Sequence, residues 1–124
     1  MMAKGATITM EFWDLTMDEP GRVPDMNHAW STAPLNMISR WVLGVTPSKP
    51  GFAEIAVSPH PGPLKRLTGF VPTVRGPVRL GMVQEAGQWN VLLDTPAPAT
   101  LDFAGCHRHF PAGRHKTTLP LALP

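Results

Sequence analysis

The chain has 124 residues, of which 43% are hydrophobic and 16% are charged, and this balance excludes an intrinsically disordered protein. Eleven Lys and Arg against nine Asp and Glu leave a charge of +2, with the basic residues scattered, so no nucleic-acid partner is expected. No apolar run reaches the roughly 18 to 20 residues of a membrane span, and no signal pattern opens the chain. We therefore expect a cytoplasmic protein without a membrane partner.

The first third of the chain predicts irregular structure and one short helix. Thr7–Leu15 suits either a helix or an extended strand, and the prolines at 20 and 24 forbid a continuous helix beyond it. Ala33–Leu43 is expected to be helical, because its apolar residues recur at the spacing of one helical face and Gly44 can end it. Trp41 lies on that face and is expected in a hydrophobic core.

The stretch Gly44–Gly51 is rich in Gly and Pro and separates two regions, which we predict to be domains of residues 1–46 and 47–124. After it, Ala53–Ser58 alternates apolar and polar residues as a strand does. Val78–Met82 and Trp89–Leu93 alternate on either side of Glu85–Ala86–Gly87, which predicts a hairpin. Shorter strands are expected at 67–71, 100–103, 108–110 and 116–119. The fold class is mainly β, a small antiparallel sandwich of six or seven strands after a short helix and an irregular N-terminal segment.

Three stretches follow one another in a characteristic order. Gly5–Trp13 reads GATITMEFW, Met26–Ser31 reads MNHAWS, and a third group contains Pro50–Gly51–Phe52, Pro59–His60–Pro61 and Arg75–Gly76–Pro77–Val78. Together they resemble the C-terminal part of bacterial α-L-rhamnosidases, glycoside hydrolases that remove terminal rhamnose. The resemblance implies that residues 1–46 are left over from the end of an α/α catalytic barrel and that residues 47–124 are a C-terminal β-sandwich domain.

The resemblance also implies roles for individual residues. Inverting glycoside hydrolysis needs a general acid and a general base whose carboxyl groups lie roughly 6.5–9.5 Å apart. Glu11 falls on the family's glutamate and would be the general base, while His28 falls on a histidine that lines the sugar site. Trp13 and Trp30 would be aromatic walls of that site. The general acid belongs to the preceding part of the barrel, which these 124 residues do not include.

Four histidines raise the hypothesis of a metal site: His60, His107, His109 and His115. His107 and His109 are two residues apart and would point the same way on a strand, but a zinc site needs three or four ligands. The single cysteine, Cys106, has no activating neighbour other than His107 and cannot form an internal disulfide. We therefore predict neither a metal nor a cofactor.

Three functions agree with these features. We favour a fragment of an α-L-rhamnosidase that is inactive as an isolated chain and whose partner, once a barrel is supplied, is a rhamnose-containing glycoside. The alternatives are a non-catalytic carbohydrate-binding or scaffolding module, and a complementing subunit of a split enzyme. Without a barrel, the apolar side chains of residues 1–44 need another partner, which predicts a homo-oligomer through this segment.

Overall fold

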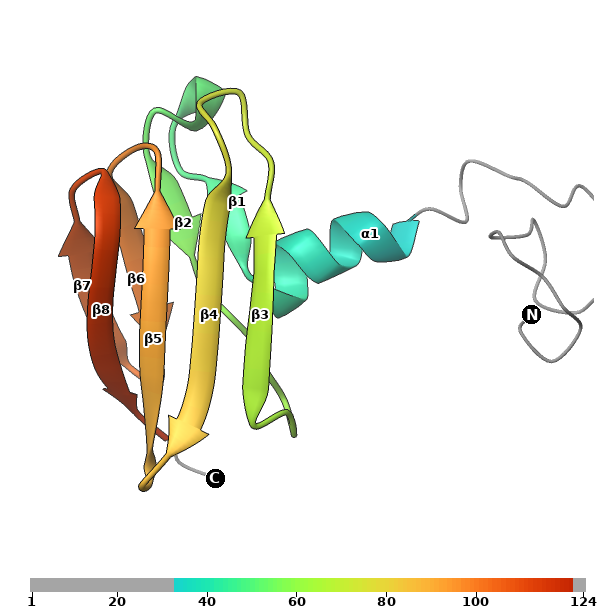
Figure 1. Ribbon diagram of the computed structural model, residues 1–124. Helices are drawn as coiled ribbons and strands as arrows, with labels where there is room; N and C mark the ends of the chain where they lie inside the picture. Colours follow the sequence, from blue (N-terminus) through green and yellow to red (C-terminus); the bar gives the residue numbers. More distant parts are fainter. Residues whose placement is uncertain (1–32, 122–124) are drawn as a thin grey trace, which may run out of the picture. The chain divides into compact units, whose positions relative to one another are not determined.

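The computed structural model describes residues 33–121, which begin with a short helical segment followed by a β-sandwich (Figure 1). Helix α1 (Ala33–Met37) continues into a π-helical turn, η3 (Ile38–Val42). The Leu43 N–H donates to the Ile38 carbonyl at 2.8 Å, five residues back, which is the π-helical pattern. The predicted helix is confirmed, and its second half is wound more loosely than an α-helix. No helix within 33–121 is long and apolar enough to cross a membrane.

Trp41 does not lie in the core, and that prediction is wrong. Its side chain is 64% exposed, and Ile38 on the same segment is 49% exposed. Only the end of the segment enters the core, through Leu43, which is 4% exposed. A Cβ added at Gly69 would lie 2.8 Å from a Leu43 methyl carbon, so the bare backbone of that strand makes room for Leu43. The helical spacing of the apolar residues holds, but the sandwich partly buries only Val42 and leaves Ile38 and Trp41 largely exposed.

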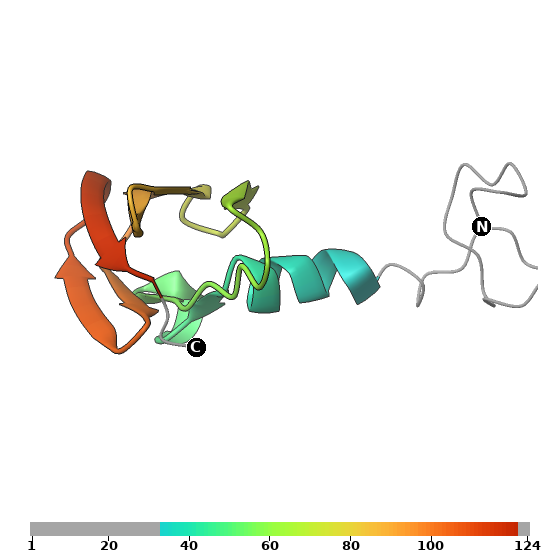
Figure 2. The same ribbon diagram turned by 90° about the horizontal axis from the view of Figure 1, so that it is seen from below.

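The sandwich consists of two four-stranded sheets, seen as separate layers in Figure 2. One sheet has the order β1-β2-β6-β7, formed by β1 (Val45–Pro47), β2 (Ile55–Val57), β6 (Ala99–Phe103) and β7 (Cys106–Phe110). The other has the order β3-β4-β5-β8, formed by β3 (Arg66–Val71), β4 (Val78–Glu85), β5 (Gln88–Thr95) and β8 (Gly113–Pro120). The β-sandwich prediction is confirmed, and the pairings within these residues are antiparallel except that β2 and β6 run parallel.

The clearest sequence prediction, the hairpin, corresponds to β4 and β5. Glu85 pairs with Gln88 across a two-residue turn in which Ala86 and Gly87 both have positive φ, 49° and 76°. Positive φ at both positions is the type I′ turn that matches the twist of a hairpin. The turn sets the register, so the inward residues of both strands are buried: Val78, Leu80, Met82, Trp89, Val91 and Leu93.

Strand β1 lies in the stretch that the sequence predicts to be a linker. Its end at Pro47 is compatible with its place at the edge of the sheet, where one side of the backbone needs no ladder partner. Gly44, just before it, has φ of 69°, and a Cβ there would lie 1.9 Å from the Ser58 carbonyl oxygen. Only glycine fits at position 44, where the backbone passes close to the Ser58 carbonyl. The division into domains 1–46 and 47–124 stays a prediction.

Candidate functional site

The residues to which the resemblance assigns catalysis and sugar binding are Glu11, Trp13, His28 and Trp30. All four lie outside the part of the chain that the structure describes. Their roles therefore stay predictions, and the candidate site within residues 33–121 is formed by the sandwich alone.

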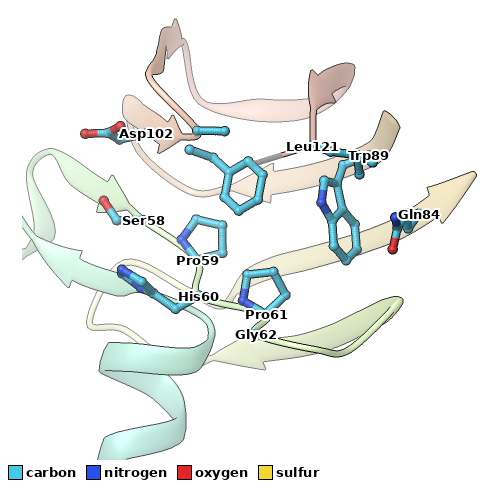
Figure 3. A pocket seen from close by; sticks show the side chains of 11 residues that line it. Ser58, Pro59, His60, Pro61, Gly62, Gln84, Trp89, Asp102 and Leu121 are labelled. Carbon is cyan, nitrogen blue, oxygen red and sulfur yellow. The ribbon is translucent and has the colours of Figure 1, made fainter. Parts of the chain in front are cut away.

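A groove with a volume of about 660 Å³ opens at one end of the sandwich, between the two sheets. The β2–β3 connection contributes Ser58–Gly62, the β4–β5 hairpin contributes Gln84 and Trp89, and the end of β6 contributes Asp102 and Phe103. Ala104 and Leu121 complete the lining. Figure 3 shows Gln84 and Trp89 on the opposite side of the groove from the Ser58–Gly62 connection. Its size lies within the range of small-molecule pockets.

The apolar part of the groove is held rigidly. Trp89 packs edge-on against Phe103, with ring centroids 6.2 Å apart and ring planes at 83°. Pro59 and Pro61 are buried on the opposite wall. Because both aromatic residues belong to paired strands and the two prolines have fixed φ, the walls of the groove are largely preformed.

His60 fixes the β2–β3 connection to the end of the helical segment. Its ring Nδ1 lies 3.1 Å from the Trp41 carbonyl oxygen, and its backbone N–H donates to the Val42 carbonyl at 3.0 Å. Ser58, two residues before His60 in the same connection, donates its backbone N–H to the Gly44 carbonyl at 2.9 Å. His60 therefore lines the groove as a structural residue, with one ring nitrogen already occupied.

Within residues 33–121, Asp102 is the only carboxylate that lines the groove. Its Oδ2 lies 3.3 Å from Nδ1 of His107, and the Asp102 side chain is about half exposed while that of His107 is mostly exposed. The other carboxylates of residues 33–121 are elsewhere: Glu54 pairs with Lys49, Glu85 accepts a hydrogen bond from Asn90, and Asp94 lies on β5. A two-carboxylate acid–base mechanism thus has at most one of its groups in this groove.

The remaining histidines are accounted for by local contacts. His107 and His109 lie on β7 and point the same way, as predicted, beside Asp102 and Thr100 of β6, with His109 Nδ1 3.0 Å from Thr100 Oγ1. His115 packs against the Phe110 ring, at 5.0 Å between centroids, and bonds the Pro111 carbonyl. No group of three or more His, Cys, Asp or Glu residues within 33–121 is arranged to hold a metal.

Cys106 is half-buried against the core.

The sequence did not identify this groove, because its lining comes from four separate elements. The hairpin pattern predicts that Trp89 shares a strand face with Val91 and Leu93, and the Pro59–His60–Pro61 sequence indicates the end of a strand. Nothing in either pattern shows that the two segments meet. The groove results from the pairing of β2 with β6, since this brings residues 58–62 next to residues 102–104.

Comparisons with known proteins agree on one family. Residues 44–104 match the family model described as the bacterial α-L-rhamnosidase C-terminal domain. The chain is also 29% identical over 104 residues to an α-L-rhamnosidase of Alteromonas sp. (strain LOR), a match that covers 80% of this chain and 11% of that protein.

Solved structures share the fold. Those of α-L-rhamnosidases from Dictyoglumus thermophilum and Aspergillus terreus align with TM-scores of 0.82 and 0.79 at 16% and 19% identity. The alignments cover 97% and 98% of this chain. That from Streptomyces avermitilis, in complex with L-rhamnose, aligns with a TM-score of 0.75 at 20% identity over 95% of the chain. The chain spans only 14% to 17% of the length of these three proteins.

Proposed function

Residues 44–104 belong to the C-terminal domain of the bacterial α-L-rhamnosidase family, and from this premise we propose that the chain serves rhamnoside hydrolysis as part of such an enzyme, without hydrolysing rhamnosides by itself. The observation that supports the lack of activity in the isolated chain is the set of carboxylates that line the groove. Asp102 is the one carboxylate that the described part of the chain contributes, half-exposed and beside His107, whereas inverting hydrolysis requires an acid and a base on opposite faces of the sugar.

The proposal assigns the chemistry to residues 5–31. Glu11 would draw a proton from the attacking water, and His28 would hydrogen-bond a hydroxyl of the rhamnose, with either imidazole nitrogen able to serve. Trp13 and Trp30 would pack against the sugar ring. The general acid would come from a barrel supplied by a longer polypeptide or by a separate chain.

The first experiment measures release of 4-nitrophenol from 4-nitrophenyl α-L-rhamnopyranoside by the purified 124-residue chain. We expect no release above that of buffer. Release that Glu11→Gln abolishes would show that the chain is a complete catalyst and would contradict the proposal.

The second experiment supplies the barrel by fusing the chain to the preceding region of the Alteromonas enzyme. We expect the fusion to hydrolyse the substrate and Glu11→Gln to lower kcat by about 10²–10⁴-fold, the usual contribution of a general base. Glu54→Gln is the matched control, because Glu54 pairs with Lys49 in the sandwich and should not change kcat. Equal losses in the two variants of an active fusion would remove Glu11 from the mechanism.

The groove favours a second candidate function, a non-catalytic carbohydrate-binding module. It combines apolar walls at Pro59, Pro61 and Trp89 with polar groups at Gln84 and Asp102, the mixture that sugar rings and hydroxyls require. Calorimetric titration with L-rhamnose tests it, and Gln84→Ala should weaken any binding measured. Absence of heat at millimolar sugar would eliminate this candidate.

The proposed homo-oligomer concerns residues 1–44 when no barrel is present. Its support within the described chain is the exposure of Met37, Ile38 and Trp41, at 57%, 49% and 64%. Light scattering of the purified chain is the test, and we expect a mass above that of a monomer. A monomer at high concentration would contradict this part of the proposal.

A further inference from the structure

The outer face of the β3-β4-β5-β8 sheet is basic. Its outward positions include Arg66 on β3, Arg79 on β4, and Arg114 and Lys116 on β8, and we call these four residues the basic face. All four side chains are exposed. Two carboxylates share this side of the sheet. Asp94 on β5 lies opposite both Arg79 and Arg114, and Glu85 at the end of β4 accepts a hydrogen bond from Asn90. Four cations against two carboxylates leave a positive surface.

The centre of this face is hollow. Gly81, Val83, Asn90 and Leu92 line a depression of about 650 Å³, with Lys116 and Thr118 at its β8 side. Gly81 lies opposite Thr68 on one side and Leu92 on the other, so the strand at the centre has no side chain where its neighbours do. The floor is therefore partly apolar, and Lys116 is the cation among the described residues that line it.

The cations of the basic face are not neutralised by ion pairs within the described sandwich. None of them forms an ion pair with a carboxylate of residues 33–121. Arg79 lies over the ring of Phe70, with its guanidinium carbon 5.7 Å from the ring centroid, and Phe70 is itself 60% exposed. Phe70 therefore presents an exposed ring on the same face as the hollow, two residues along β3 from Thr68, which lies opposite Gly81.

We propose that this face binds an anionic polysaccharide, a sugar chain with carboxylate or sulfate groups, by its charges and by contact of sugar rings with the hollow and Phe70. Neighbouring strands are about 4.8 Å apart and rise about 3.4 Å per residue, so Arg79 on β4 and Lys116 on β8, which differ by two strands and by two residues in register, are about 12 Å apart. That separation suits anionic groups on different residues of a polymer better than a single small anion. A hollow face also suits a flexible sugar chain better than duplex DNA, whose grooves are read by protruding elements.

The experiment measures binding of the full chain to three polymers by calorimetry at low and at physiological salt. Polygalacturonate carries carboxylates, dextran sulfate carries sulfates, and dextran is neutral. We expect binding to at least one anionic polymer, weakened several-fold by the higher salt, and none to dextran. The comparison of the two anionic polymers identifies which acidic group the face prefers. Binding of dextran as tightly as both anionic polymers would overturn the proposal, as would absence of binding to either.

Two variants test the location. Arg79→Gln with Lys116→Gln should weaken binding about tenfold, while Lys49→Gln with Arg75→Gln removes the same charge near Gly51 and should leave it unchanged. Gly81→Val changes no charge and should also weaken binding, because the new side chain fills the hollow. A Cβ at Gly81 would meet only Leu92, at an ordinary 3.8 Å, so this variant should fold.

The outcomes separate a site from a general effect of charge. Equal weakening by the two double variants, or binding of a DNA duplex as tight as that of the anionic polymers, would reduce the basic face to a non-specific polyanion surface and overturn the proposal. Circular dichroism confirms that each variant is folded. Binding at this face does not depend on hydrolysis, so failure of this proposal leaves the proposed function untouched, and the reverse also holds.

Discussion

The β4–β5 hairpin and the helical segment Ala33–Val42 have equally regular apolar patterns, but their apolar faces differ in outcome. In the hairpin, Leu80, Met82 and Leu93 are between 0% and 2% exposed. In the helical segment, Ile38 and Trp41 are 49% and 64% exposed. A periodic pattern therefore predicts the type of element and which residues share a face. It does not predict whether the fold covers that face.

The difference has a physical cause. The hairpin belongs to a sheet whose inner face packs against a second sheet, so each inward residue is covered by residues far away in sequence. The helical segment enters the sandwich only through Leu43 and the half-buried Val42. Ile38 and Trp41 of this segment are not covered by the sandwich. The following predictions test this contrast.

The largest effect is expected from Leu80→Ala. Leu80 is 2% exposed at the centre of the hairpin, and truncating its buried side chain leaves a cavity that costs about 2–5 kcal/mol of unfolding free energy. Urea denaturation followed by circular dichroism measures the loss. Leu64→Ala is the control, because Leu64 is 49% exposed and should lose less than about 1 kcal/mol. Similar losses would mean that the sandwich core is not packed as described.

The next effect is expected from Gly44→Ala, at about 2–4 kcal/mol, because the added Cβ meets the Ser58 carbonyl and the residue has positive φ. Gly51→Ala is a matched control. Gly51 also has positive φ, 62°, but a Cβ there has no neighbour within 4 Å, so it should cost only about 1 kcal/mol. Equal costs would show that backbone conformation, and not the close approach to Ser58, explains the glycine at position 44.

A smaller effect of opposite sign is expected at the hairpin turn. Ala86 has φ of 49° in a type I′ turn, where Asn is preferred, so Ala86→Asn should stabilise the chain by about 0.5–1 kcal/mol. Ala104 has φ of 51° in the equivalent turn between β6 and β7, and Ala104→Asn should act alike. Thermal unfolding measures both, and a lowered Tm in either variant would contradict the turn assignment.

The smallest effect is expected from Trp41→Ala, within about 0.5 kcal/mol, because the side chain is mostly exposed and the contact with His60 uses the Trp41 backbone carbonyl. This variant tests the contrast most directly. A loss above about 1 kcal/mol at low protein concentration would mean that the helical face is covered within the folded chain. A loss that appears only at high concentration would instead support the oligomer.

Local pattern was sufficient to predict the strands and their facing residues, because alternation and turn chemistry act over a few residues. The alternation predicts that Trp89 and Val91 share one face of their strand, and both are buried. The short strand β1 was missed because Val45–Pro47 is part of a Gly- and Pro-rich stretch whose pairing with β2 depends on residues about ten positions later. The predicted site at Glu11 and His28 stays a prediction that rests on the resemblance.

The sequence by itself determined the fold class, the hairpin register and, through its ordered motifs, the relation to the α-L-rhamnosidases. Only the tertiary structure decided that Trp89, Pro59 and Asp102 share one groove, that Arg79 and Lys116 share one face of a sheet, and that Trp41 remains exposed. The first set depends on interactions between residues close in the chain. The second depends on which strands pair and which faces pack together, and that is a property of the whole chain.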